Sequence, residues 1–150
     1  MARVAIGNCE PDSRRSVGEA AVAKLTDPKA LERVAIDGKG LSVAGYAQRR
    51  LPEPLDPALL ARMALEAKDA LVRESAIGKV TDQPVLVKAA LTDKESGPRR
   101  AAVAQLTDQM ALSQVLLEDK NDGVRLAALP QVTDPAVLAK VALTDTNGKL

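Results

Sequence analysis

Apolar residues recur along this chain with the spacing of a helix, and the whole pattern repeats. Residues 72–93 read VRESAIGKVTDQPVLVKAALTD, residues 98–119 read PRRAAVAQLTDQMALSQVLLED, and residues 124–145 read VRLAALPQVTDPAVLAKVALTD. One aspartate marks the same point of every copy: Asp27, Asp56, Asp82, Asp108 and Asp134. The markers are 29, 26, 26 and 26 residues apart, so the chain holds five units, and the second unit carries three extra residues. A period of this length predicts a stack of similar helical or turn units.

Three apolar columns follow each marker and predict a helix. The residue four positions after the marker is always leucine: Leu31, Leu60, Leu86, Leu112 and Leu138. Seven positions after it stand Val34, Met63, Ala89, Val115 and Val141, and nine positions after it stand Ile36, Leu65, Leu91, Leu117 and Leu143. Since these positions follow a helical period, we expect the three columns to form one buried stripe.

The marker itself is a helix-start signal. Aspartate accepts hydrogen bonds from free N–H groups of a first helical turn, and Pro28, Pro57 and Pro135 follow at a position where a missing N–H costs nothing. The preceding threonine is the alternative cap, in four of the units: Thr26, Thr81, Thr107 and Thr133.

Another, shorter helix is predicted before each marker. We call it the first helix of its unit, and we call the helix after the marker the second helix. When the three extra residues of the second unit are discounted, valine stands ten positions before the marker in four units (Val17, Val43, Val72 and Val124), with Pro98 as the exception. Alanine stands six positions before it in all five: Ala21, Ala47, Ala76, Ala102 and Ala128. Alanine in every copy indicates two backbones that approach closely. Helices of about ten residues are unstable alone in water, so the units are expected to stack into an α-solenoid.

The pattern "VR..A....TDP..L..VAL.D" resembles the HEAT/armadillo type of helical repeat and, in its length, the leucine-rich-variant repeat. The resemblance implies an all-α fold, an α-solenoid of about five two-helix HEAT-like repeats coiled as a right-handed superhelix, and a role as a binding scaffold. We expect a single repeat domain over residues 1–150. It divides into a partial unit 1–12, units at about 13–38, 39–67, 68–93, 94–119 and 120–145, and a tail 146–150.

The two ends of the array lack the polar capping units that solenoids usually carry. The stretch VAIGN at residues 4–8 matches VALTD at residues 141–145, so the array begins in the middle of a unit. Three explanations stay open: a fragment of a longer array, end-to-end association between copies, or bare ends that the chain tolerates.

Composition excludes several classes of chemistry. The chain has 21 Lys and Arg against 20 Asp and Glu, so no overall field attracts nucleic acid or an anionic membrane. The absence of histidine excludes histidine-based catalysis and metal binding, and the single cysteine, Cys9, excludes a disulfide within the chain. We therefore expect no catalytic residue, no metal and no cofactor. No segment approaches the length of a membrane span, and we expect a cytoplasmic protein without a membrane partner.

An arginine recurs nine positions before the marker in the last three units, as Arg73, Arg99 and Arg125. A cation near a helix N-terminus is disfavoured and calls for a compensating charge. Asp93 and Asp119 lie six residues before Arg99 and Arg125. We therefore expect a ladder of Asp–Arg ion pairs that links successive units, with anion binding as the alternative.

Two groups of residues are candidates for binding a partner. Basic residues stand six positions after the marker in four units, as Arg33, Arg62, Lys88 and Lys140, with Gln114 in the remaining one. In the second unit, Tyr46, Arg49 and Arg50 form a local cluster of residue types that are frequent at interface hot spots.

The basic column is open to two interpretations. If the second helices line the concave face, it forms a basic stripe that suits a protein or peptide. The alternative is a solvated face whose cations complement the helix dipole. The function expected is a non-enzymatic protein–protein interaction scaffold. Nucleic-acid binding through the basic stripe, or a structural or regulatory segment of a larger protein, are the alternatives.

Overall fold

The computed structural model describes residues 17–144, with residues 41 and 42 described by their backbone only. Over this part the chain forms ten α-helices, one short 3₁₀ helix and no strand. The helices are α1 (Val17–Lys24), α2 (Pro28–Asp37), α3 (Leu41–Arg50), α4 (Pro57–Glu66), α5 (Ala70–Ile77), α6 (Gln83–Thr92), α7 (Ser96–Val103), α8 (Gln109–Glu118), α9 (Asp122–Ala128), η1 (Leu129–Gln131) and α10 (Pro135–Thr144). The fold is therefore all-α and repeat-like, as the sequence predicts.

The marker aspartates start the second helices α2, α4, α6, α8 and α10. Asp56 Oδ1 accepts the N–H of Ala58 at 2.8 Å, and Asp134 Oδ1 accepts the N–H of Ala136 at 2.8 Å. Asp82 also occupies the N-cap position of its helix but accepts no such bond. The cap is thus the aspartate and not the preceding threonine.

The buried stripe of the second helices differs from the prediction in one column. Residues four and seven positions after the marker are buried or half-buried, but those nine positions after it include Leu91 and Leu143, which are 36% and 86% exposed. The third buried column lies eight positions after the marker and contains Ala35, Ala64, Ala90 and Leu116. Helical geometry explains the difference. Position eight lies one turn from position four, whereas position nine is rotated away from it by about 140°.

The alanine column of the first helices forms their contacts. Ala47, Ala76, Ala102 and Ala128 are all 0% exposed, and α5, α7 and α9 pack on one another more extensively than the second helices do. Ala21 in α1 is exposed instead, since among the described residues α1 has a neighbouring first helix on one side only. The small side chain allows the first helices to approach closely, because interaxial distance depends on the residues at the contact.

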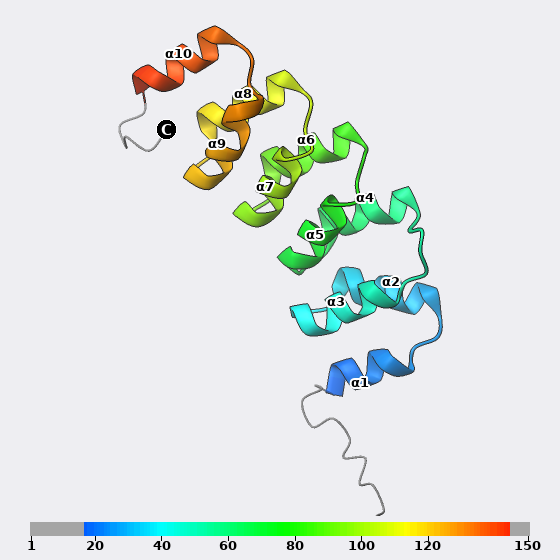
Figure 1. Cartoon of the computed structure of the whole chain (residues 1–150). Coiled ribbons are helices and arrows are strands. Elements are labelled where there is room, and N and C mark those ends of the chain that lie inside the picture. Colours follow the sequence, from blue (N-terminus) through cyan, green and yellow to red (C-terminus); the bar gives the residue numbers. More distant parts are fainter. Residues whose placement is uncertain (1–16, 145–150) are drawn as a thin grey trace, which may run out of the picture.

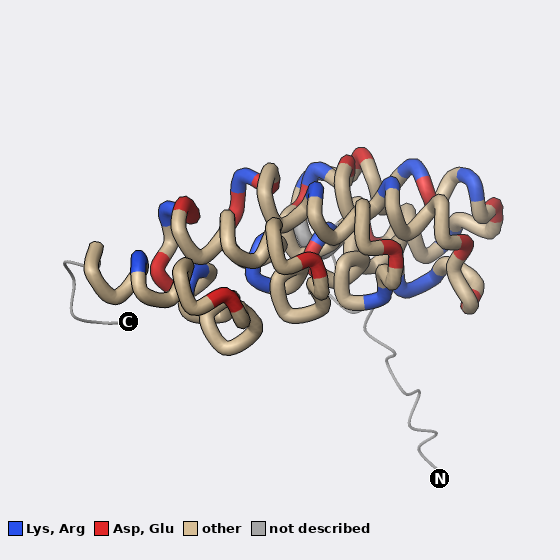
Figure 2. The backbone as a smooth tube through the Cα atoms, turned by 90° about the horizontal axis from the view of Figure 1, so that it is seen from above, with Lys and Arg blue, Asp and Glu red and all other residues tan. Residues whose placement is uncertain are grey.

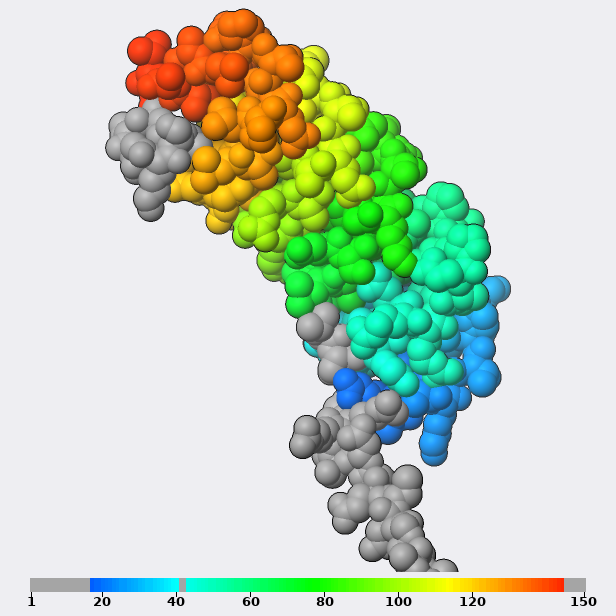
Figure 3. All heavy atoms as spheres, viewed as in Figure 1, coloured from blue at the N-terminus to red at the C-terminus, as the bar shows by residue number. Residues whose placement is uncertain are grey.

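The helices are arranged in pairs that follow one another along a bent array (Figure 1). The most extensive contacts join α2 with α3, α4 with α5, and α6 with α7, and α8 pairs with α9 in the same way. Each pair combines the second helix of one unit with the first helix of the next unit, across a turn of three residues: 38–40, 67–69, 93–95 and 119–121. Figure 3 shows the same bend in the packed surface.

Candidate binding surface

Buried arginines form a network that we call the arginine ladder, in which Arg73 pairs with Asp93 and Arg99 pairs with Asp119, each within one unit. Nε and Nη2 of Arg73 donate to the two carboxylate oxygens of Asp93 at 2.6 and 2.9 Å. Arg99 binds Asp119 in the same way, at 2.7 and 2.9 Å. In each pair the side chains are only 5% and 6% exposed. Bidentate pairs of this kind fix the orientation of both partners.

The pairing differs from the one expected from sequence. Each aspartate binds the arginine twenty residues before it, and the arginine six residues after it binds its backbone instead, since Nη1 of Arg99 donates to the carbonyl oxygen of Asp93 at 3.0 Å. Arg125 likewise donates to the carbonyl oxygen of Asp119, at 2.7 Å, and its Nη2 pairs with Asp122. Asp93 therefore contacts the arginines of two successive units.

The environment of the arginine ladder favours the ionised forms. Burial alone raises the pKa of Asp93, but hydrogen bonds from Arg73 and from the N–H of Glu95 hold that pKa below its ordinary value. The pKa of Asp119 is lowered in the same way, against burial, by Arg99 and by the N–H of Asn121. Both carboxylates are thus charged near neutral pH.

A second network, which the sequence reasoning missed, joins the units at the other ends of the helices. We call it the glutamine ladder. Gln83 Oε1 accepts the N–H and the hydroxyl of Thr107 at 2.9 and 3.0 Å, and Gln83 Nε2 donates to the carbonyl of Gln105 at 3.1 Å. The next unit repeats these bonds with Gln109, Thr133 and Gln131.

The glutamine ladder also has a signal in the sequence. Gln105 and Gln131 each stand three positions before a marker, and each donates to a carbonyl 28 residues earlier, in Ile77 and Val103. Arg50 occupies the corresponding position of the second unit and donates to the carbonyl of Val22 at 2.6 Å. Glutamine directly after Asp82 and Asp108, and glutamine three positions before Asp108 and Asp134, together with the threonine before these markers, were therefore available to predict contacts between units.

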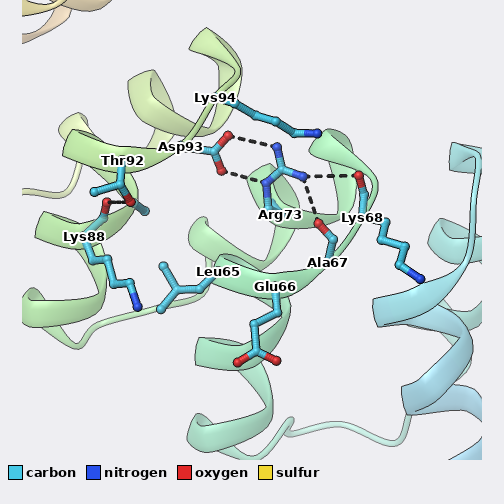
Figure 4. Close-up of a pocket in the computed structure, with 10 residues that line it drawn as sticks. Leu65, Glu66, Ala67, Lys68, Arg73, Lys88, Thr92, Asp93 and Lys94 are labelled. Carbon is cyan, nitrogen blue, oxygen red and sulfur yellow. Dashed lines mark hydrogen bonds and ion pairs between the residues drawn. The ribbon is translucent and has the colours of Figure 1, made fainter.

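A cleft of about 450 Å³ lies between the second helices α4 and α6, near their C-terminal ends. We call it the α4/α6 cleft. Its lining includes Leu65, Lys68, Lys88, Thr92 and Lys94. The arginine ladder crosses it: Figure 4 shows the guanidinium of Arg73 between the carboxylate of Asp93 on one side and the carbonyls of Ala67 and Lys68 on the other.

The same cleft recurs one unit further along the chain, between α6 and α8. Two adjoining hollows of about 150 and 230 Å³ form this α6/α8 cleft. Their lining contains Leu91, Asp93, Arg99, Gln114 and Lys120. These positions correspond, 26 residues further along the chain, to positions 65, 67, 73, 88 and 94 in the lining of the α4/α6 cleft. The repeat thus places equivalent clefts side by side on the second helices.

All four basic residues six positions after the marker are exposed on second helices. Lys88 lines the α4/α6 cleft, and Arg33 borders an open hollow of about 730 Å³ beside α2. Arg62 pairs with Glu66 on its own helix at 3.7 Å. Figure 2 shows basic and acidic residues interspersed along the whole array, so these cations are local features and not part of a surface of one sign.

The residues of the cluster around Tyr46 have different surroundings in the structure. The guanidinium carbon of Arg49 lies 6.0 Å from the centre of the Tyr46 ring, at a distance where a cation–π contact is weak. Tyr46 itself is half-buried against the core. Arg50 turns away to bind the carbonyl of Val22, so it stabilises the contact between α1 and α3.

Buried polar atoms and clusters of acidic residues mark no further site within residues 17–144. In this part every buried side-chain nitrogen or oxygen has a hydrogen-bond partner, and no three Cys, Asp or Glu residues gather in a way that would hold a metal ion. None of its helices has the length and apolar character needed to cross a bilayer. The second-helix clefts are therefore the features of this surface with the geometry of a binding site.

The fold and its contacts define an all-helical, repeat-like protein. Comparisons of the chain with protein-family models, with curated proteins and with solved structures find no match. The likeness to HEAT and armadillo repeats therefore depends on the repeat pattern of this chain alone.

Proposed function

We propose that this chain is an α-solenoid of HEAT-like repeats that acts as a non-enzymatic scaffold and binds a protein or peptide on its second helices. The observation that carries the proposal is the recurrence of one cleft, with equivalent lining residues, between successive second helices. Equivalent sites at a fixed spacing suit a partner segment that runs along the array.

The two ladders support this function because they restrict movement between the units. At one end of the helices Arg99 and Arg125 bind backbone carbonyls of the preceding unit, and at the other end the glutamine ladder joins the units. A site on rigid elements loses less entropy when it binds than a site on mobile loops. The scaffold is thus pre-organised for a partner.

The second helices offer the more open face of the array. The first helices α5, α7 and α9 are packed more closely, as the inner side of a bent stack requires. We therefore propose that the second helices carry the binding face, but on the outer side of the bend and not on the concave side expected from the sequence.

Site-specific photo-crosslinking in the source lysate tests this proposal. A photoreactive residue replaces Leu91 in the α6/α8 cleft, and a control replaces Arg100, which is exposed on α7. We expect one discrete protein to crosslink at position 91 and not at position 100, with or without nuclease. Crosslinking only to nucleic acid, or equally from both positions, would contradict the proposal.

A matched pair of triple variants gives a second test. Arg33→Glu, Lys88→Glu and Lys140→Glu reverse three charges on second helices, and they should abolish the crosslink. The control reverses three exposed charges on or just after first helices, in the variant Lys24→Glu, Lys79→Glu and Arg100→Glu. The control has the same net charge, so an equal loss in both variants would show that the effect comes from overall charge and not from the second-helix face.

A further inference from the structure

Resting on the proposed function, we propose that the α4/α6 cleft binds an acidic side chain of an extended partner segment, and that the α6/α8 cleft binds a neutral side chain of the same segment. The two clefts differ in the charges that remain available to a ligand, and one such difference is that Lys88 of the α4/α6 cleft is replaced by Gln114 in the α6/α8 cleft.

The arginine of the α4/α6 cleft is fully occupied by the protein. Arg73 makes five hydrogen bonds, to Asp93, Glu95 and the carbonyls of Ala67 and Lys68. A guanidinium has five N–H donors, so none remains for a ligand. The bonds to the two carbonyls have a second effect. They cover oxygen atoms just after α4 that would otherwise repel an anion.

Lysines supply the charge that a ligand can reach. Lys68 pairs with Asp37 at 3.2 Å and Lys94 lies 3.5 Å from Glu95, and both pairs are well exposed. Lys88 has no ion pair with any described residue. Figure 4 shows its amino group beside Leu65, at the edge of the cleft away from the arginine ladder. Lys88 is thus the cation that an incoming carboxylate can neutralise.

The α6/α8 cleft lacks this cation. Gln114 replaces Lys88 there, and its amide donates to Glu118 at 3.1 Å. Lys120 is the cleft's one lysine and Glu118 lies in the same lining, so the charges on the rim cancel. Leu91, which is 36% exposed, contributes an apolar wall. This cleft therefore favours a neutral, partly apolar side chain.

The spacing of the clefts defines the segment. Neighbouring helices are about 10 Å apart, and a segment in the extended polyproline II conformation advances about 3.1 Å per residue with three residues per turn. An acidic residue and an apolar residue three positions apart therefore lie on the same side of the segment and reach both clefts. The ligand class is an extended acidic peptide segment of a protein.

Titration followed by NMR tests the inference, because it detects weak binding residue by residue. The probe is a short Gly/Ser peptide with one Glu and one Leu about three positions apart. A second peptide has Gln in place of Glu. We expect the Glu peptide to shift amides that line the two clefts. Lys88→Gln should weaken its binding about two- to fivefold, as loss of one exposed charge contact does.

Two variants sharpen the result. Gln114→Lys gives the α6/α8 cleft the missing cation and should strengthen binding of a peptide with Glu at both positions by about the same factor. Lys24→Gln, an exposed charge change on α1, should leave both affinities unchanged. Unchanged binding in Lys88→Gln, or equal binding of the Glu and Gln peptides within the clefts, would overturn the acidic preference while the scaffold function stands. Shifts caused by single-stranded DNA but by neither peptide would overturn both.

Discussion

Removing the charge of Asp119 tests the energetic role of the arginine ladder. The substitution Asp119→Asn keeps the shape of the side chain and an oxygen that accepts the N–H of Asn121, which Asp119 binds at 2.8 Å. It leaves the guanidinium of Arg99 buried, with a side chain 5% exposed and without its carboxylate. Breaking a buried pair at one partner costs about 3 kcal/mol, and we expect a loss of this size in the free energy of unfolding.

The assay is urea unfolding followed by circular dichroism, because Tyr46 is the chain's one aromatic residue and gives little fluorescence. In the double variant Arg99→Met with Asp119→Asn, both charges are gone, and stability should return to within about 1 kcal/mol of the wild type. The control is Asp37→Asn, whose pair with Lys68 is exposed and should matter by less than about 0.5 kcal/mol. A loss below about 0.5 kcal/mol in Asp119→Asn, or a larger loss in the double variant than in the single one, would refute the reasoning.

Three further predictions concern stability. Both carboxylates of the arginine ladder have lowered pKa values, so their contribution to the free energy of unfolding is complete above the unfolded-state pKa of about 4 and is lost as the pH falls through the folded-state pKa values. Acid titration of the wild type should show this loss of stability, and a variant with both carboxylates changed to Asn should lose less stability over the same pH range. Gln83→Ala removes three hydrogen bonds between units and should cost about 1–2 kcal/mol, whereas Gln114→Ala should be nearly neutral in the same urea assay. Asp56→Ala removes a helix cap and should cost about 1 kcal/mol, while Asp82→Ala should cost less because that side chain accepts no capping bond; equal costs would contradict this account.

The helices could be predicted from the sequence because their signals are local. The marker aspartate and the proline after it define where α2, α4 and α10 begin, through bonds within one turn. The third buried column was wrong in part, because position nine is apolar in each unit, yet Leu91 and Leu143 are exposed while Ile36 is buried. Residue type alone therefore does not decide burial at this position.

The contacts between units could be predicted only in part. Asp93 is six residues before Arg99 and twenty after Arg73, so spacing alone leaves two partners for its carboxylate. The choice depends on how α5, α6 and α7 pack together, and this is a tertiary property. The clefts could not be predicted for the same reason, since their walls come from helices of two units.

The regular spacing of the ladder contacts has a consequence for how such a chain can change in length. The glutamine ladder joins each unit to its neighbour through residues 22 to 28 positions apart, and the ladder arginines reach back six positions to the carbonyl that ends the preceding unit. A duplication or deletion of 26 residues therefore keeps these donors and acceptors in register, whereas a change of another length keeps the register only where a loop takes it up, as the loop between α3 and α4 does for the three extra residues of the second unit. Growth by whole copies, followed by single substitutions such as the one that distinguishes Gln114 from Lys88, lets one cleft diverge while its neighbours keep their shape.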